Sequence, residues 1–176
     1  METKKLTIVI EPDPILHKTA LPVEKITLDL LDELEQMTSI MTSLQGIGLA
    51  GPQVGLLKRI IVIDVATIAR EDKVKPPSEK FLKLINPEIL SFSKETCVRE
   101  EGCLSLPTLF YDIKRPSSIK LKYTNTKGDE IIVDMDGLLA RCVEHEIDHL
   151  DGKIILDYIS PLRKHMAIRK LQKIKI

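Results

Sequence analysis

The chain has 176 residues, of which 43% are hydrophobic and 30% are charged. This length suits one domain with a sizeable core, so we expect residues 1–176 to form a single domain. No apolar run is long enough to span a membrane, and the N-terminal segment lacks the features of a signal peptide. The three cysteines have no disulfide-like spacing, which favours reduced thiols and a cytoplasmic location.

Charge is balanced over the whole chain but unevenly placed. Residues 160–176 contain six basic side chains and no acidic one, so the other 159 residues have a net charge of −6. A basic tail on an acidic body favours a polyanionic partner, although charge runs are usually only solvated faces.

The first elements in chain order are a short strand and a long helix. The run "LTIVI" predicts a strand over Leu6–Ile10. From Leu28 to Leu44, apolar residues recur at helical spacing and predict an amphipathic N-terminal helix. Thr27 is expected to cap its start, and Gly46 stands where a C-terminal glycine belongs.

The stretch "GIGLAGPQVG", residues 46–55, contains the G-x-G-x-x-G pattern of dinucleotide-binding loops. That loop must follow a strand and precede a helix. Here a predicted helix precedes it, and the β-branched strand Arg59–Val65 follows it. The order is reversed, so the sequence argues against nucleotide binding.

The middle of the chain predicts short strands and turns. Residues 69–80 are polar, and strands are expected over Phe81–Ile85 and Glu88–Phe92. A turn-rich region follows around "EEGCLSLP", and then a hairpin of residues 118–123 and 130–134 joined by "TNTKGD".

Two helices complete the prediction. One begins at the cap residue Asp136, is apolar on most sides in its first half and ends at Gly152; the other begins at Ser160 and Pro161. The second is basic, with Ala167, Leu171 and Ile174 on one face. Because strands and helices do not alternate regularly, we predict an α+β fold with short antiparallel sheets around the first of these helices, which should be buried.

The motif "HEIDH", residues 145–149, lies on that buried helix. Two imidazoles four residues apart point the same way, so His145 and His149 are expected to bind one metal ion. Glu146 can then act as a general base towards a metal-bound water. The alternative is an exposed polar helix face, which the apolar turns before the motif disfavour.

A catalytic site needs a third protein ligand. Asp151, Asp157 and His165 are the candidates after His149, which is a poor supply, so an upstream ligand is favoured. We rank Cys103 in "EEGCLSLP" first, because it lies between a glycine and a turn-forming segment. Cys142 lies on the same helical face as His145, but it is equally well explained as a small buried residue, and Cys97 as a strand residue.

Three ordered segments resemble one family. "GIGLAGPQ", "EGCLSLP" and "HEIDHLDG" are similar to the three motifs of peptide deformylase, which removes the formyl group from the N-terminal formylmethionine of new bacterial proteins. The likeness covers nearly the whole chain. It implies a hydrolase that acts during protein biosynthesis on nascent N-formylmethionyl peptides.

The resemblance also implies the roles of individual residues. Cys103, His145 and His149 would hold one metal ion, typically Fe²⁺, for which Ni²⁺, Co²⁺ or Zn²⁺ can substitute. Glu146 would transfer the proton. The Gln53 side chain and the Leu104 backbone N–H would stabilise the oxyanion.

The family also has an apolar pocket for the methionine side chain. Its matching positions are Ile47, Gly48, Leu138 and Cys142, which lowers the claim of Cys142 as a ligand. Arg115 matches a basic position of the family, with a solvated surface arginine as the alternative.

Two residues depart from the family's pattern. Gly51 stands where alanine is usual, which should loosen the loop, and Glu144 replaces a common glutamine and can simply point to solvent. These departures leave open a deformylase-like protein that binds ribosomes or nascent chains without turnover. A general HExxH peptidase is a further alternative. The basic C-terminal helix, residues 160–176, has a counterpart in some members that docks on the ribosome, and it suits RNA phosphates.

Overall fold

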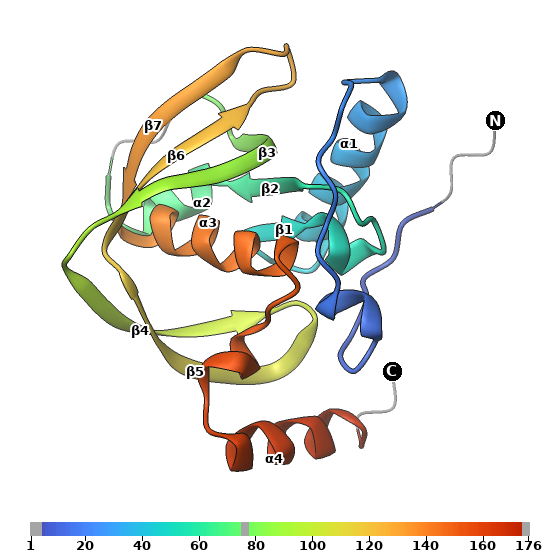
Figure 1. Ribbon diagram of the computed structural model, residues 1–176, viewed down its shortest axis with the longest axis vertical. Helices are drawn as coiled ribbons and strands as arrows, with labels where there is room; N and C mark the ends of the chain where they lie inside the picture. Colours follow the sequence, from blue (N-terminus) through green and yellow to red (C-terminus); the bar gives the residue numbers. More distant parts are fainter. Residues whose placement is uncertain (1–4, 75–77, 174–176) are drawn as a thin grey trace.

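The computed structural model describes residues 5–74 and 78–173, and Figure 1 shows its elements in chain order. The helices are α1 (Leu28–Ser43), α2 (Val65–Glu71), α3 (Gly137–Leu150) and α4 (Pro161–Leu171), with 3₁₀ turns η1 (Pro14–His17), η2 (Gly51–Val54) and η3 (Ile155–Tyr158). The strands are β1 (Gly48–Ala50), β2 (Ile60–Asp64), β3 (Phe81–Phe92), β4 (Thr96–Cys103), β5 (Leu106–Pro116), β6 (Ser118–Thr124) and β7 (Glu130–Asp136).

Two antiparallel sheets surround helix α3. One has five strands in the order β1-β2-β3-β6-β7, and the other is the pair β4-β5. Helix α3 crosses the middle of the molecule between the five-stranded sheet and the β4-β5 pair, while α4 lies at the far end beyond β5 (Figure 1). The α+β prediction, with short antiparallel sheets around a buried helix, is confirmed.

Apolar packing holds α3 against the five-stranded sheet. One cluster joins α3 to the five-stranded sheet through residues such as Val143, Leu150 and Leu121, all fully buried. A second cluster packs α1 against β1 and β2, and a third joins η1, β5, η3 and α4. Burying a large aliphatic side chain contributes about 1.5–3 kcal/mol, so the helix that carries the HEIDH motif is rigidly supported.

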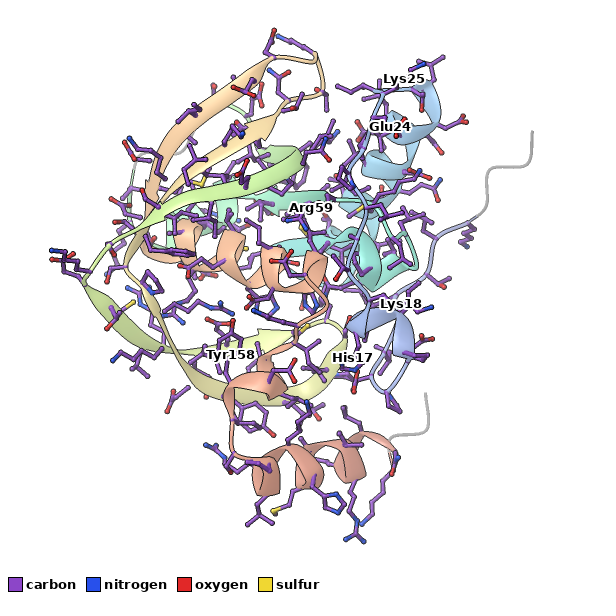
Figure 2. The ribbon with its side chains drawn as sticks, viewed as in Figure 1. His17, Lys18, Glu24, Lys25, Arg59 and Tyr158 are labelled. Atoms are coloured by element: carbon purple, nitrogen blue, oxygen red, sulfur yellow. The ribbon has the colours of Figure 1, made fainter. Side chains whose placement is uncertain are left out.

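The predicted helix starts at Thr27 and Ser160 are confirmed, but the predicted C-terminal glycine of α1 is wrong: after the cap residue Leu44, Gln45 and not Gly46 has the left-handed conformation, with a φ of 56°. The Thr27 hydroxyl accepts a hydrogen bond from the Leu30 N–H at 3.2 Å, and Ser160 caps α4 with Pro161 in the first turn. Gly152 follows α3 with a φ of 74°, and a Cβ there would lie 2.7 Å from the carbonyl oxygen of His17. His17, labelled in Figure 2, ends η1, so this glycine lets the N-terminal segment approach α3 closely.

The start of α3 differs from the prediction in one detail. Asp136 stands at the N-cap position, but its side chain makes no capping hydrogen bond. Instead, the Leu138 N–H donates to a carboxylate oxygen of Asp72 at 2.8 Å. The cap therefore comes from a residue distant in sequence, directly after α2.

The basic C-terminal helix packs as expected where the structure describes it. Ala167 and Leu171 are buried against the third cluster, and Ile174 lies outside the described residues. Within the described residues, the search for a helix long and apolar enough to cross a membrane finds none.

The predicted strand Leu6–Ile10 is wrong. This segment is not part of either sheet, although the Val9 N–H donates to the carbonyl oxygen of Gln53 at 2.7 Å. Leu6 is buried against the cluster around α1. The apolar pattern therefore reports burial of the segment and not strand pairing.

Three smaller predictions need correction. The two strands predicted over residues 81–92 form one strand, β3, with irregular pairing after Ile85. The polar segment predicted over residues 69–80 begins inside helix α2, and the glycine-rich loop contains the short strand β1. The boundaries of these elements depend on tertiary contacts, which local sequence patterns do not report.

The region around "EEGCLSLP" is also not mainly a turn. Most of it belongs to the long hairpin of β4 and β5, in which Thr96 pairs with Pro116 and Gly102 with Phe110. The pairing shifts after Gly102, and Cys103 opposes Leu106. The tight end of this hairpin brings Cys103 to α3.

Candidate metal centre

Three side chains meet where the β4-β5 hairpin reaches α3. The ligand atoms of Cys103, His145 and His149 lie within 4.8 Å of one another, the one such group found among the described residues. The Cys103 Sγ is 3.2 Å from Nε2 of His149. The two imidazoles come from successive turns of α3, with ring centroids 5.0 Å apart. One thiolate and two imidazoles form a donor set that suits a divalent transition metal.

The two histidines are set for ligation by what surrounds their other nitrogen atoms. Nδ1 of His145 hydrogen-bonds to Glu101 at 3.0 Å, which leaves Nε2 for the metal. Nδ1 of His149 is buried with no partner in the described part of the chain, and burial lowers the pKa of this imidazole well below its usual value. A neutral His149 is the form that a metal ion requires.

Glu146 lies in the same cavity. It is only 4% exposed, and its Oε2 atom has no hydrogen-bond partner among the residues described. Burial raises the pKa of its carboxyl to about 7, against the opposing effect of His145. A Cβ at Gly48 would lie 2.5 Å from Oε1 of Glu146. Only glycine therefore fits at position 48, because any Cβ there would clash with the Glu146 carboxylate.

Gln53 is held with its amide nitrogen towards Cys103. Its Oε1 accepts a hydrogen bond from the Ala50 N–H at 2.8 Å, which orients the side chain. Its Nε2 then lies 3.5 Å from the Cys103 Sγ and 3.3 Å from the Ser105 hydroxyl. The turn η2 thus presents an amide donor beside the candidate ligand.

Two of the three metal-ligand candidates, Cys103 and His145, line a pocket of about 660 Å³, whereas His149 does not line it. A Cβ at Gly46 would lie 2.7 Å from Cδ1 of Leu104, so the glycine-rich loop lies close to this residue. The lining includes the residues predicted from the sequence: Ile47, Gly48, Gln53, Cys103, Leu104, Leu138, Cys142, His145 and Glu146.

Cys142 forms part of the pocket wall. Its thiol is 3.7 Å from the carbonyl oxygen of Ile47, and burial raises its pKa well above the usual value. A neutral thiol is a small apolar group and a poor ligand. Cys142 is also outside the group that could share a metal ion, which separates it from Cys103.

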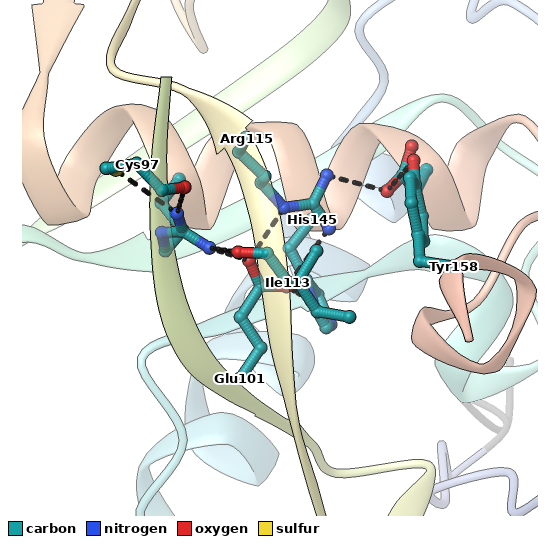
Figure 3. Close-up of polar contacts among 8 residues, drawn as sticks. Cys97, Glu101, Ile113, Arg115, His145 and Tyr158 are labelled. Carbon is teal, nitrogen blue, oxygen red and sulfur yellow. Dashed lines mark hydrogen bonds and ion pairs between the residues drawn. The ribbon is translucent and has the colours of Figure 1, made fainter. Parts of the chain in front are cut away.

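A cluster of charged side chains supports His145 from behind (Figure 3). The Glu101 carboxylate accepts hydrogen bonds from Arg115 at 2.7 and 3.0 Å and is also paired with Arg141. Burial raises the pKa of Glu101, but the hydrogen bonds from His145 and Arg115 outweigh it and lower the pKa to about 2. Glu101 is therefore an anion that fixes the His145 ring.

The cluster continues to the start of the C-terminal segment. Arg115 donates to Asp148 at 2.9 Å, and the Tyr158 hydroxyl donates to the same carboxylate at 2.8 Å (Figure 3). Burial and this carboxylate raise the pKa of Tyr158 to about 12. Arg115 is 3% exposed, so the alternative of a solvated surface arginine is wrong.

Most of this cluster has no role that local sequence reasoning predicts. Glu101 and Asp148 lie inside the motifs "EGCLSLP" and "HEIDHLDG", but nothing in those motifs shows that they share Arg115 as a partner, and Arg141 and Tyr158 lie outside them. Of the cluster, only Arg115 is predicted from the family resemblance. Arg141 also donates to the Cys97 backbone and thiol, at 2.8 and 3.2 Å.

The two departures from the motif pattern have structural explanations. A Cβ at Gly51 would lie 2.6 Å from the Lys58 carbonyl oxygen and 2.8 Å from that of Leu56, so glycine fits this tight turn and does not simply loosen it. Glu144 does not point to solvent, because it is 5% exposed. Burial raises the pKa of its carboxyl to about 7.

Comparisons with known proteins agree with this geometry. A family profile described as polypeptide deformylase matches residues 5–165. A peptide deformylase of Bartonella tribocorum is 42% identical over 95% of this chain and 91% of its own length, and one of Thermotoga maritima is 41% identical over 92% of each chain.

Solved structures show the same likeness. The crystal structure of peptide deformylase from Ehrlichia chaffeensis superposes with a TM-score of 0.88 at 38% identity, covering 97% of this chain and 96% of that one. A structure of the same protein in complex with actinonin has a TM-score of 0.87 at 38% identity and covers 96% of each chain.

Proposed function

This chain belongs to the peptide deformylase family, and from that premise we propose that Cys103, His145 and His149 hold its catalytic metal ion. The chain is a metal-dependent hydrolase that removes the formyl group from N-terminal methionine during protein biosynthesis. The observation that carries the assignment is the convergence of the three ligand atoms within 4.8 Å, beside the buried carboxylate of Glu146. We further propose that residues 1–176 act as one catalytic domain.

We assign Fe²⁺ as the metal, with Ni²⁺, Co²⁺ or Zn²⁺ as substitutes. A thiolate with two imidazoles accepts all of these ions, so the loaded metal depends on availability as well as affinity. When bound, a divalent ion supplies Lewis acidity that polarises the formyl oxygen and activates water.

Glu146 is assigned as the group that moves the proton. Its carboxylate can take a proton from the attacking water and return it to the leaving amine as the C–N bond of the formamide breaks. The products are formate and a free N-terminal amine. The Oε2 atom supports this role, because it is buried in the cavity without a competing partner among the described residues.

Gln53 and the Leu104 N–H are assigned as the oxyanion donors. The Ala50 N–H holds Oε1 of Gln53, so Nε2 faces Cys103 and the Ser105 hydroxyl, where it can donate to a substrate oxygen. Leu104 directly follows Cys103 and lines the same pocket, which supports its N–H as the second donor. Such donors contribute about 2.7–4 kcal/mol each to transition-state stabilisation.

The methionine side chain is assigned to the apolar part of the pocket, formed by Ile47, Gly48, Leu138 and Cys142. Gly48 is essential to this arrangement, because a Cβ there would lie 2.7 Å from the Cys142 Sγ as well as close to Glu146. An unbranched, flexible thioether suits such an irregular apolar wall.

We also propose that the protein acts in the cytoplasm on nascent chains and docks on the ribosome through its basic C-terminal helix. Leu162 and Met166 of α4 are 71% and 62% exposed, and basic side chains surround them. Reversing charge at Arg169 and Lys170 should weaken co-sedimentation with ribosomes, and high salt should do the same. Unchanged co-sedimentation would reject docking through α4.

The central test is formate release from a formyl-Met peptide by protein purified without oxygen and reloaded with iron or nickel. An acetyl-Met peptide and an unblocked peptide are the controls. Release from the formyl peptide alone supports the assignment. Cleavage of unblocked peptides would point to a general peptidase, and metal binding without turnover would point to a non-catalytic binder.

A further inference from the structure

A second cavity lies where helix α2 and the first turn of α3 meet strands β6 and β7 (Figure 1). Its volume is about 490 Å³, and small-molecule sites range from roughly 300 to 1,000 Å³. Among the described residues it shares no lining residue with the catalytic pocket. Leu139 lines this cavity, whereas its neighbour Leu138 lines the catalytic pocket. The two cavities are therefore separate sites beside one turn of helix.

The wall of this cavity is largely apolar. Ile68 of α2, Leu82 of β3 and Val133 of β7 are among the residues that form it. All three belong to the core cluster that joins α3 to the five-stranded sheet or pack against it, so the core supports this wall. Such a surface can bind the aromatic or aliphatic part of a ligand.

The cavity also carries negative charge. Its lining includes four carboxylates: Asp72, Glu79, Asp134 and Asp136. No Lys or Arg side chain is found among the described residues that line it. Arg99 is 3.7 Å from Asp72, and Lys120 is 3.7 Å from Asp134, and both basic side chains are about half exposed. Long, exposed pairs of this kind contribute little, so the lining favours a cationic ligand.

The carboxylate of Asp72 is held in place by the start of α3. It accepts the hydrogen bond from the Leu138 N–H at 2.8 Å. Gly137 has a φ of 58°, and a Cβ there would lie 2.7 Å from Oδ2 of Asp72. This part of the charged lining is thus fixed before a ligand arrives, which lowers the entropy lost on binding.

Tyr123 contributes a hydroxyl group without a partner. This residue of β6 is 8% exposed and lines the cavity, and its hydroxyl makes no hydrogen bond within the described part of the chain. Buried phenols usually find a partner, so an unpaired one in a cavity indicates a place for a ligand. Burial raises the pKa of Tyr123, and the charge of Glu79 adds to this effect. The phenol is therefore neutral, and its oxygen can accept a hydrogen bond.

We propose that this cavity is a second ligand site, which binds a small organic ammonium ion with an aromatic or aliphatic body. The body packs on the apolar wall, while the ammonium group donates hydrogen bonds to the Tyr123 oxygen and to exposed carboxylates such as Glu79 and Asp134. The site lies apart from the catalytic residues, so its occupancy does not depend on deformylation.

The test is a calorimetric titration of the metal-loaded protein at pH 7 with three probes that share one skeleton: phenethylammonium, phenethyl alcohol and phenylpropanoate. The ammonium ion should bind about fivefold to tenfold more tightly than the alcohol, because it gains charge pairing. The carboxylate probe should bind more weakly than the alcohol. Higher salt should weaken binding of the ammonium ion and leave that of the alcohol unchanged.

Two variants test the assigned groups. Tyr123→Phe should lower the affinity of the ammonium ion by about threefold to tenfold, because one hydrogen-bond partner is lost. Glu79→Gln combined with Asp134→Asn should bring the ammonium-to-alcohol ratio of affinities close to one. Both carboxylates are exposed, so this double variant should fold normally.

Glu130→Gln is the matched control. Glu130 is an exposed carboxylate of β7 that is not among the residues lining the cavity, so its replacement should leave all three affinities unchanged. Urea unfolding of each variant checks the fold. Tyr123→Phe should retain the stability of the wild type, because the hydroxyl that it removes has no partner in the described structure.

Three results would overturn the proposal. The first is an absence of ammonium binding, and the second is equal affinity for the three probes, which would indicate an apolar cavity without selection for charge. The third is ammonium binding that persists unchanged in Tyr123→Phe and in the double variant while the probe competes with formyl-Met peptides. That pattern would place the probe in the catalytic pocket. A protein that binds the ammonium ion as expected but releases no formate would support this site and reject only the proposed function.

Discussion

Two groups of polar side chains meet at helix α3, and they differ in how far their hydrogen-bonding atoms are paired. Behind His145, Glu101 is bound by Arg115 and Arg141, and Arg115 continues to Asp148. In front, Oε2 of Glu146 and Nδ1 of His149 have no partner in the part of the chain that the structure describes.

This difference in pairing shows which part of the site is ordered by the protein itself and which part requires a bound ligand. In the supporting cluster Glu101, Arg115 and Arg141 are buried and charge-paired, although Nε of Arg141 has no partner among the described residues. These pairs can hold the His145 ring in one orientation before any metal or substrate arrives. In front, Oε2 of Glu146 and Nδ1 of His149 are buried without a hydrogen-bond partner among the described residues, which is unfavourable for stability. Natural proteins accept that penalty at sites where a ligand satisfies the groups.

The largest expected effect comes from removing the upstream ligand. Cys103→Ala should abolish tight metal binding and with it activity, because one thiolate and two imidazoles become two imidazoles. Cys142→Ser should retain the metal and alter affinity for the methionine side chain. The two variants are distinguished by measuring the metal content per protein molecule after dialysis, together with kcat and KM. Loss of metal in Cys142→Ser alone would reverse the ligand assignment.

Glu146→Gln should separate catalysis from metal binding. We expect kcat to fall by about 10²–10⁴, the usual contribution of a positioned proton-transfer group, with metal content unchanged. The free energy of unfolding should not fall, because the change removes a buried carboxylate that lacks a partner. Near-normal turnover in this variant would show that Glu146 does not transfer the proton.

Substitutions in the supporting cluster, unlike Glu146→Gln, should lower both the free energy of unfolding and the metal affinity. Arg115→Met leaves Glu101 and Asp148 without their shared cation, and breaking a buried pair in this way destabilises proteins by about 3–5 kcal/mol. Metal affinity should also fall, by roughly 10–100-fold, because Glu101 no longer holds His145 as firmly. Urea unfolding and metal titration measure the two effects.

A matched control lies on the same hairpin. Arg99 is a half-exposed arginine of β4, 3.7 Å from Asp72, and Arg99→Met should change the free energy of unfolding by less than about 0.5 kcal/mol. Equal destabilisation by Arg99→Met and Arg115→Met would remove the distinction between buried and exposed charge pairs.

The sequence predicted the front of the site much better than the back. His145, Glu146 and His149 follow from helical spacing alone, because one turn of helix places them together. Cys103 could only be ranked first by its neighbours until the family resemblance supported it. These residues carry the chemistry, so short motifs report them directly.

The supporting cluster was beyond prediction for a physical reason. Glu101 contacts Arg115 and Arg141, which are 14 and 40 residues away, and only the packing of the β4-β5 hairpin on α3 brings them together. The same limit explains the cap of α3. Asp136 has the right local position, but Asp72 makes the hydrogen bond through tertiary structure.

The last prediction, also a small effect, tests whether burial is what makes the supporting cluster important. Lys164 of α4 pairs with Asp157 of η3, and both side chains are about one-third exposed. Burial raises the pKa of Asp157, but the hydrogen bonds from Lys164 and the Ile154 N–H outweigh it, so the net pKa is lowered from its ordinary value of 3.8. A carboxylate with a lowered pKa stabilises the folded state above its ordinary pKa, and this contribution is lost as pH falls through the folded value.

Asp157→Asn should therefore lower the free energy of unfolding at pH 7 by no more than about 1 kcal/mol. The difference from the wild type should shrink as the pH falls below 3.8. Urea unfolding at neutral and acidic pH measures both quantities. A loss as large as that of Arg115→Met would mean that ion pairing alone, and not its burial beside His145, sets the importance of these charges.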